Sequence, residues 1–138
     1  MAGLYVHVPF CRRRCRYCAF VSSTNHEAVP AYVETALREI ALRSAPDLRC
    51  ETIHFGGGTP SVLPAGALIR ILEGLRANFD VAPDAEVALE ANPGTIREGE
   101  LKALYDAGVN RIVLGAQSFD EEDLHFLGRI HTARETVE

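Results

Sequence analysis

Short apolar runs alternate along the chain with longer segments in which apolar residues recur at helical spacing. The runs predict strands at residues 4–10, 51–55, 86–91 and 111–116. Two predicted helices between them would bury Val33, Ala36, Leu37, Ile40 and Ala41, and then Leu68, Ile71, Leu72, Leu75 and Phe79. Strands that alternate with helices predict a parallel sheet, and the scarcity of polar residues within the runs fits burial on both faces.

Capping and terminating residues set the expected ends of the helices. Pro46 would end the first helix. Thr95 and Thr132 each precede a glutamate by three residues, which is the capping-box pattern that opens a helix. A further short helix would stop at Gly128. Because the sequence stops at Glu138, about one turn into the last predicted helix, we expect it to belong to a longer domain.

Two parallel architectures fit this order of elements, a doubly wound sheet and a (β/α) barrel. In a doubly wound sheet ligand residues gather at the switch point, so only a couple of strands contribute. In a barrel every strand ends at the same mouth. Unusual residues follow all four predicted strands here: the cysteines from Cys11, the glycines from Gly56, then Glu90 and Gln117. Since four strands cannot close a barrel, we expect an α/β fold that forms the N-terminal part of one.

The composition is that of a globular protein, with 47% of the 138 residues hydrophobic and 24% charged. A net charge of −5 gives no basic footprint for nucleic acid. The sequence also lacks a long apolar run and a basic N-terminus followed by an apolar core, so it predicts no transmembrane segment, no signal peptide and a cytoplasmic location. Cytoplasmic thiols stay reduced, which makes a cysteine cluster more often metal-binding than disulfide-bonded.

Three cysteines follow the first predicted strand in the spacing C-x3-C-x2-C: Cys11, Cys15 and Cys18. A structural zinc site needs four ligands, and Cys50 stands alone far along the chain. A 4Fe-4S cluster is normally held by four thiolates, so three would leave one iron open to another ligand. A disulfide, a zinc loop and coincidence are the alternatives.

Four arginines are interleaved with these cysteines, namely Arg12, Arg13, Arg14 and Arg16. They form either a solvated loop or a surface that docks an anionic partner. Their positive charge would also favour the thiolate forms that iron requires.

Later positions carry candidate binding chemistry. The glycines at 56–58 either let the backbone approach a ligand closely or form a tight turn before Thr59. Glu90 either meets a ligand at the end of its strand or is a solvated terminus. Gln117 could be a turn residue, and Arg129 alone would be assigned to the surface.

Taken together, these motifs resemble the radical S-adenosylmethionine (SAM) superfamily and, within it, the oxygen-independent coproporphyrinogen III oxidase-like family. The matching segments are residues 4–11, 54–61, 89–93, 115–119 and 127–131. The resemblance implies a partial (β/α)6 barrel followed by a C-terminal domain. Residues 1–138 would be the truncated N-terminal part of the barrel domain. It also implies a cluster whose open iron binds SAM and whose electron splits SAM into methionine and a 5'-deoxyadenosyl radical.

The resemblance further implies roles residue by residue. Cys11, Cys15 and Cys18 would hold the 4Fe-4S cluster. The SAM contacts would be Tyr5, Gly57, Gly58, Thr59, Glu90, Gln117 and Arg129, and Tyr17 would pack beside SAM near the cluster.

Phe20 distinguishes two branches of this family. The coproporphyrinogen-decarboxylating enzymes extend the motif to C-x3-C-x2-C-x-C, and this chain has Phe20 at the last position. That departure resembles the heme chaperone branch, whose members bind heme and hand it to apoproteins. We therefore expect a heme chaperone, with heme or a porphyrin, a heme-accepting client protein and an unidentified electron donor as partners.

The alternative is an oxygen-independent coproporphyrinogen III dehydrogenase, in which the radical leads to oxidative decarboxylation of propionate side chains. A third hypothesis is a cysteine-stabilised metal module without SAM. The sequence leaves open whether the protein is an enzyme, and we assign no catalytic residue.

Overall fold

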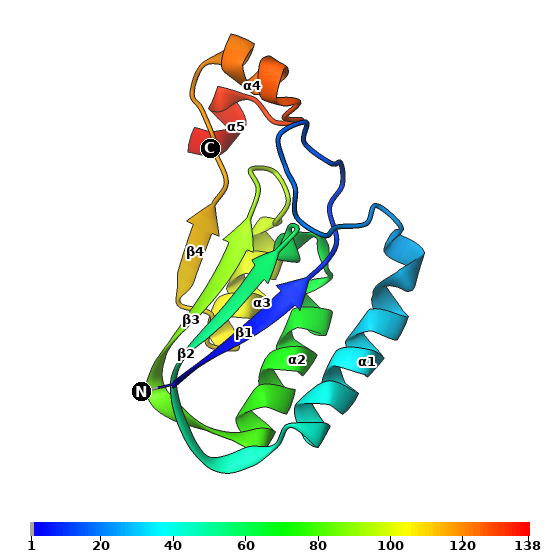
Figure 1. The fold of residues 1–138 in the computed structure, drawn as a ribbon. Coiled ribbons are helices and arrows are strands. Elements are labelled where there is room, and N and C mark those ends of the chain that lie inside the picture. Colours follow the sequence, from blue (N-terminus) through cyan, green and yellow to red (C-terminus); the bar gives the residue numbers. More distant parts are fainter. Residues whose placement is uncertain (1) are drawn as a thin grey trace.

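Four parallel strands form one sheet whose spatial order, β1-β2-β3-β4, is also their order along the chain (Figure 1). This computed structural model describes residues 2–138. The strands are β1 (Ala2–Val8), β2 (Ala45–Gly57), β3 (Phe79–Ala91) and β4 (Arg111–Leu114). A doubly wound sheet reverses its strand order at the switch point, whereas a barrel keeps it sequential. The order therefore confirms the predicted α/β fold as the start of a barrel.

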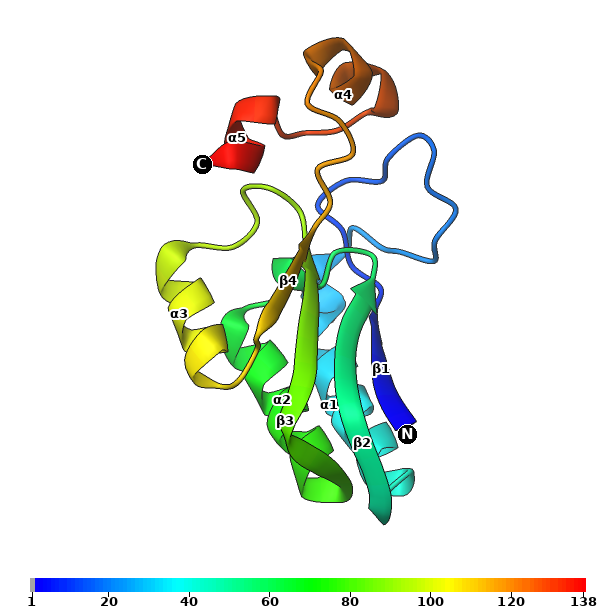
Figure 2. The ribbon, with the colours of Figure 1, turned by 90° about the vertical axis from the view of Figure 1, so that its left-hand side faces the viewer.

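Helices connect successive strands and cover a single face of the sheet. The helices are α1 (Val29–Leu42), α2 (Ala65–Asn78), α3 (Glu98–Asp106), α4 (Glu121–Leu127) and α5 (Ala133–Val137), with short 3-10 turns η1 (His26–Ala28) and η2 (Pro60–Val62). In Figure 2, α1, α2 and α3 lie together on one side of the sheet, while α4 and α5 lie beyond the ends of the strands. None of these helices is both long and apolar enough to cross a membrane in the described part of the chain.

The core lies between the sheet and helices α1 and α2. Its most completely buried large side chains include Ile53, Phe55, Ile71, Leu72 and Leu89. These positions combine alternate residues of β2 and β3 with the apolar stripe of α2, so the two sequence periods meet at one interface.

The opposite face of the sheet is uncovered in residues 2–138, so this part of the chain shows the predicted burial on one face alone. Along β1, Val6 and Val8 are buried, while the alternating residues Tyr5 and His7 are exposed. Tyrosine and histidine have largely apolar rings, so the sequence of β1 gives the impression of an uninterrupted apolar strand. Its side chains in fact alternate between a covered and an uncovered face of the sheet.

Several boundaries differ from those predicted, for local reasons. Helix α1 ends at Leu42, before Pro46. Pro46 instead lies inside β2, where the pairing with β3 shifts register between Ala45 and Arg49. At this irregularity the strand does not require the backbone N–H that proline lacks. Helix α3 begins at Glu98 rather than near Thr95. The Thr95 hydroxyl donates to the Asn92 carbonyl oxygen instead, so it closes a turn and caps no helix. The predicted stop at Gly128 and the capping box of Thr132 are both present.

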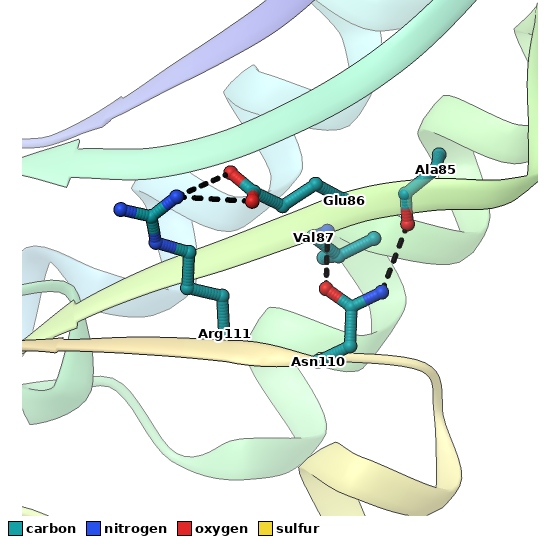
Figure 3. Close-up of polar contacts among 5 residues, drawn as sticks. All are labelled: Ala85, Glu86, Val87, Asn110 and Arg111. Carbon is teal, nitrogen blue, oxygen red and sulfur yellow. Dashed lines mark hydrogen bonds and ion pairs between the residues drawn. The ribbon is translucent and has the colours of Figure 1, made fainter.

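Side chains at the start of β4 tie this short strand to β3 (Figure 3). The Asn110 amide accepts a hydrogen bond from the Val87 N–H at 2.8 Å and donates one to the Ala85 carbonyl oxygen at 2.9 Å. The next residue, Arg111, donates to both carboxylate oxygens of Glu86, at 3.0 and 3.1 Å. The side chain of Asn110 therefore extends the hydrogen bonding between β3 and β4 by one residue before the four residues of β4.

We predict that Asn110→Ala lowers the free energy of unfolding by roughly 1–2 kcal/mol, because two hydrogen bonds to the backbone of β3 are lost. Arg111→Ala serves as the control and should cost about 0.5 kcal/mol or less, because its ion pair with Glu86 is exposed. Urea denaturation monitored by circular dichroism measures both changes. Equal losses for the two variants would contradict the role assigned to Asn110.

Candidate functional site

A cavity of about 340 Å³ lies at the carboxyl ends of the strands. Because all four strands are parallel, these ends meet at one edge of the sheet, below the loops at the top of Figure 1. All but one of the predicted site residues line the cavity: Cys11, Cys15, Tyr17, Cys18, Gly57, Gly58, Thr59, Glu90, Gln117 and Arg129. Tyr5 is the exception. The sheet therefore brings ten of the predicted residues, which lie far apart in the sequence, together at one cavity.

The cysteines lie on a loop that is closed at its base. A parallel bridge joins Phe10 to Ser23, where the Cys11 N–H donates to the Ser23 carbonyl oxygen at 3.0 Å and the Ser23 N–H donates to that of Pro9 at 2.8 Å. The His26 ring lies 3.0 Å from the Cys11 carbonyl oxygen and supports the same point. The loop therefore leaves β1 at a fixed position and direction.

Two of the four arginines on this loop fasten it to neighbouring segments. The Arg12 guanidinium donates to the Gly94 carbonyl oxygen at 3.1 Å, and the Arg16 N–H donates to that of Leu127 at 3.3 Å. Arg13 and Arg14 instead line the cavity. For the Arg13 and Arg14 side chains, both predictions from the sequence stay open: a solvated surface or contact with an anionic partner.

The three thiols of the loop are free and differ in burial. Cys11 is buried, while Cys15 and Cys18 are half-buried and are joined by a turn in which the Cys18 N–H donates to the Cys15 carbonyl oxygen. Within residues 2–138, no three His, Cys, Asp or Glu side chains lie close enough together to hold a metal ion as they stand. All three thiols of the loop line the same cavity, but their sulfur atoms are not close enough together to bind one metal ion in this arrangement.

Cys50 belongs to a different part of the molecule. It is buried on β2 opposite Ala2, at the amino end of the sheet, and its thiol lies 3.4 Å from the Leu48 carbonyl oxygen. Burial, and secondarily the charge of Asp80, raises the pKa of the Cys50 thiol. A thiol held in its protonated form is a poor metal ligand, so Cys50 is separated from the loop cysteines by both place and chemistry.

Gly58, the residue directly after β2, is required by the chain's own packing. The Gly58 and Thr59 N–H groups donate to the carbonyl oxygens of Val8 and Phe10, at 2.9 and 2.7 Å. A Cβ atom on Gly58 would lie 2.6 Å from the Phe10 carbonyl oxygen and 2.9 Å from Cys11 Sγ. The absence of a side chain at Gly58 therefore lets the β2 loop seat the start of the cysteine loop.

Arg129 connects four segments that surround the cavity. One terminal nitrogen donates to Cys15 Sγ at 3.3 Å and to the Tyr17 hydroxyl at 3.4 Å. The other donates to Asn92 Oδ1 at 2.7 Å and to the Gly115 carbonyl oxygen at 2.8 Å. Among the described residues, Arg129 Nε is buried and has no hydrogen-bond partner. These acceptors are formally neutral, so the cation faces the cavity without a carboxylate to neutralise it.

The remaining predicted residues differ in their surroundings. Glu90 pairs with His54, with 2.9 Å between Oε1 and Nε2, and the Tyr5 ring stacks on His54 with centroids 5.8 Å apart. Burial and the nearby Glu90 raise the pKa of the Tyr5 phenol. Burial also raises the pKa of the Tyr17 phenol, and Arg129 partly offsets this.

Gln117 adopts a left-handed conformation with φ of 69°, which is uncommon for a residue with a side chain. It follows β4 by three residues, in a turn where the Ser118 N–H donates to the Ala116 carbonyl oxygen. The strained backbone holds Gln117 at the cavity wall.

Three polar residues of the site were not predicted. Asn92 binds Arg129, His54 binds Glu90, and His131 lies beside Arg129 while its Nε2 is 3.0 Å from the Ala116 carbonyl oxygen. Asn92 could have been found, because it is a polar residue at the carboxyl end of a predicted strand.

A parallel sheet of sequential strands, with a cysteine loop and a cavity at its carboxyl edge, gives this chain the α/β fold of the N-terminal part of a barrel. The sequence profile of the Radical SAM superfamily matches residues 5–138, and the chain belongs to this superfamily. This confirms the resemblance inferred from the motifs.

The similar proteins include heme chaperones and oxygen-independent coproporphyrinogen III oxidases. The heme chaperone HemW of Escherichia coli is 43% identical over 137 residues, 96% of this chain and 36% of that protein. The oxygen-independent coproporphyrinogen III oxidase of Bradyrhizobium diazoefficiens is 38% identical over 141 residues, 99% of this chain and 31% of that protein.

A solved structure of coproporphyrinogen III oxidase (HemN) from Escherichia coli, described as a radical SAM enzyme, matches with a TM-score of 0.88 at 30% identity. The match covers 98% of this chain and 32% of that chain. The chain thus spans about a third of the length of the relatives it matches.

We predict that Gly58→Ala lowers the free energy of unfolding by about 1–3 kcal/mol, because its methyl group would meet the Phe10 backbone and Cys11 Sγ. Gly66→Ala is the matched control, since within residues 2–138 a Cβ atom there would meet no heavy atom within 4 Å beyond its own stretch of helix, and helix propensity should add about 0.5 kcal/mol. Urea unfolding of both variants tests this. A Gly58→Ala protein as stable as the parent would show that the two loops are less closely packed than described.

Proposed function

We propose that Cys11, Cys15 and Cys18 hold a 4Fe-4S cluster in a radical SAM protein, and that the whole protein is a heme chaperone that binds and transfers heme. The observation that carries the proposal is one loop with three free thiols at a cavity shared by all four strand ends. Three thiolates leave one iron without a protein ligand, which is the position a SAM molecule would take. When bound, the reduced cluster supplies the electron that cleaves SAM.

The charges around the cavity support a zwitterionic ligand such as SAM. Within residues 2–138, the Arg129 cation has only neutral acceptors and a buried Nε without a partner, so it suits a carboxylate. Glu90 contributes a carboxylate to the same cavity and suits a cationic group. The remaining proposed contacts to SAM are Tyr5, Tyr17, Gly57, Gly58, Thr59 and Gln117.

We further propose that residues 1–138 form the first four units of a (β/α)6 barrel whose later strands and C-terminal domain follow. The apolar side chains of β4 at Ile112, Val113 and Leu114 are 40%, 38% and 43% exposed. An apolar edge of this kind suits pairing with a further parallel strand. The uncovered face with Tyr5 and His7 would then become the barrel interior.

Phe20 supports the chaperone over the oxidase. It stands where the decarboxylating enzymes carry a fourth cysteine, and its ring is 63% exposed at the cavity. A coproporphyrinogen III dehydrogenase is the second candidate, because relatives named as oxidases match about as well as the chaperones. Four free cysteines fit a reducing cytoplasm. Heme or a porphyrin, an electron donor and a client protein complete the proposal.

We predict that the protein with its complete barrel, reconstituted anaerobically with iron and sulfide, binds about four iron atoms per chain. Its reduced electron paramagnetic resonance (EPR) signal should shift when SAM is added. Serine at position 11, 15 or 18 should abolish most of the bound iron. Cys50→Ser should retain the iron and the signal, because Cys50 lies at the other end of the sheet. A cluster that SAM leaves unchanged, or iron loss in Cys50→Ser alone, would overturn the assignment.

Heme and coproporphyrinogen III distinguish the two candidate functions. We predict that titration with heme gives a saturable Soret shift and that bound heme passes to an apoprotein acceptor. Incubation of the reduced protein with SAM and coproporphyrinogen III should release no carbon dioxide and form no vinyl product above a cluster-free control. Product formation, detected by mass spectrometry, would instead assign the protein to the dehydrogenases.

A further inference from the structure

A chain of hydrogen bonds runs from Arg129 through Asn92 and Thr59 to Cys11. Arg129 donates to Asn92 Oδ1 at 2.7 Å, Asn92 Nδ2 donates to Thr59 Oγ1 at 3.0 Å, and the Thr59 hydroxyl donates to Cys11 Sγ at 3.6 Å. The same guanidinium reaches Cys15 Sγ directly at 3.3 Å. Two of the three loop sulfurs are therefore connected to one cation by different routes.

The direction of each hydrogen bond is fixed by the groups involved. A guanidinium has no acceptor, so the amide atom of Asn92 that faces Arg129 must be the oxygen. The amide nitrogen then faces Thr59 and donates to its hydroxyl oxygen. A hydroxyl has a single hydrogen, which leaves the Thr59 hydrogen free for the Cys11 sulfur. Thr59 is 4% exposed, so water has little access to compete for this hydrogen.

The guanidinium end of this chain is held by a buried histidine. His131 Nε2 lies 3.0 Å from the Ala116 carbonyl oxygen, so this nitrogen must carry a hydrogen and donate it. When the ring is neutral, Nδ1 accepts from Arg129, 3.4 Å away. Together with the Gly115 carbonyl oxygen, this contact keeps the Arg129 terminal nitrogen that binds Asn92 in place.

We propose that Asn92 is a positioning residue that aims the Thr59 hydroxyl at the Cys11 sulfur while it holds Arg129 against Cys15. Through this one amide, the hydrogen bonds at both sulfurs become interdependent. The inference rests on the proposed cluster for its functional consequence. Hydrogen bonds to ligating sulfurs disperse the negative charge that grows on reduction, so they raise the reduction potential of an iron-sulfur cluster.

The test on the reconstituted protein is a redox titration followed by EPR. Thr59→Val removes the hydroxyl in a side chain of the same shape, and Asn92→Ala removes the amide; each should shift the midpoint potential to a more negative value. Thr59→Ser retains a hydroxyl and should restore most of the parent potential. Asn110→Ala controls for general destabilisation, because Asn110 lies at the start of β4, and it should leave the potential unchanged.

The double variant separates a connected chain from two independent effects. If Asn92 acts on Cys11 through Thr59, the shift in Asn92→Ala/Thr59→Val is smaller than the sum of the single shifts. Additive shifts, or a potential that neither substitution moves, would overturn the proposal. A shift in Asn110→Ala as large as that in Asn92→Ala would assign the effect to stability and would overturn it as well.

The same variants without iron distinguish failure of this inference from failure of the proposed function. In the apoprotein, the changes in unfolding midpoint for Asn92→Ala and Thr59→Val should also be non-additive, because the two side chains share one partly buried hydrogen bond. Additive midpoints would remove the structural basis of the inference. Coupled midpoints in a protein that assembles no cluster would support the hydrogen-bond chain but overturn both the proposed function and the electronic role of Asn92.

Discussion

The contacts of the Arg129 guanidinium are the interaction on which the candidate site depends. They join the cysteine loop at Cys15, the end of β3 at Asn92 and the segment after β4 at Gly115. Arginine is suited to hold these segments together because its planar group donates hydrogen bonds in several fixed directions. A lysine could supply the charge but not this divergent set of contacts. One side chain that enters after α4 therefore adds to the backbone contacts that hold the cysteine loop over the sheet.

The second constraint is the parallel sheet, which gives the molecule two unlike faces. Helices cover one face and exclude water from Ile53, Phe55 and Leu89. On the other face Tyr5, His54 and Glu90 form a stacked and hydrogen-bonded group that remains accessible. This arrangement separates stability from binding chemistry. The covered face supplies hydrophobic stabilisation, while the uncovered face and the strand ends carry groups that interact through charge, stacking and hydrogen bonds.

How much of this was predictable depends on whether a feature is local. The left-handed stop at Gly128 and the capping box of Thr132 involve neighbouring residues, and both were predicted. The gathering of Glu90 and Gln117 also followed, because parallel strands must end at one edge. Contacts between side chains that are distant in the sequence could not be predicted in this way. The Asn92 contact with Arg129 depends on rotamers and loop positions, and Thr95 matched a capping pattern but bonds to Asn92 instead.

The end of β3 shows how the strand period itself arranges the binding groups. Leu89 and Ala91 are buried toward the helices, so Glu90 between them and Asn92 beyond must point to the other side. Both line the cavity, one as an acid and one as an amide. A slip of one residue in the pairing of β3 would place the carboxylate in the core and a leucine at the site. The free-energy cost of burying Glu90 thus enforces the same register that presents Asn92 to Arg129. The alternation of side chains along β3 therefore determines both the packing of the core and the polar lining of the site.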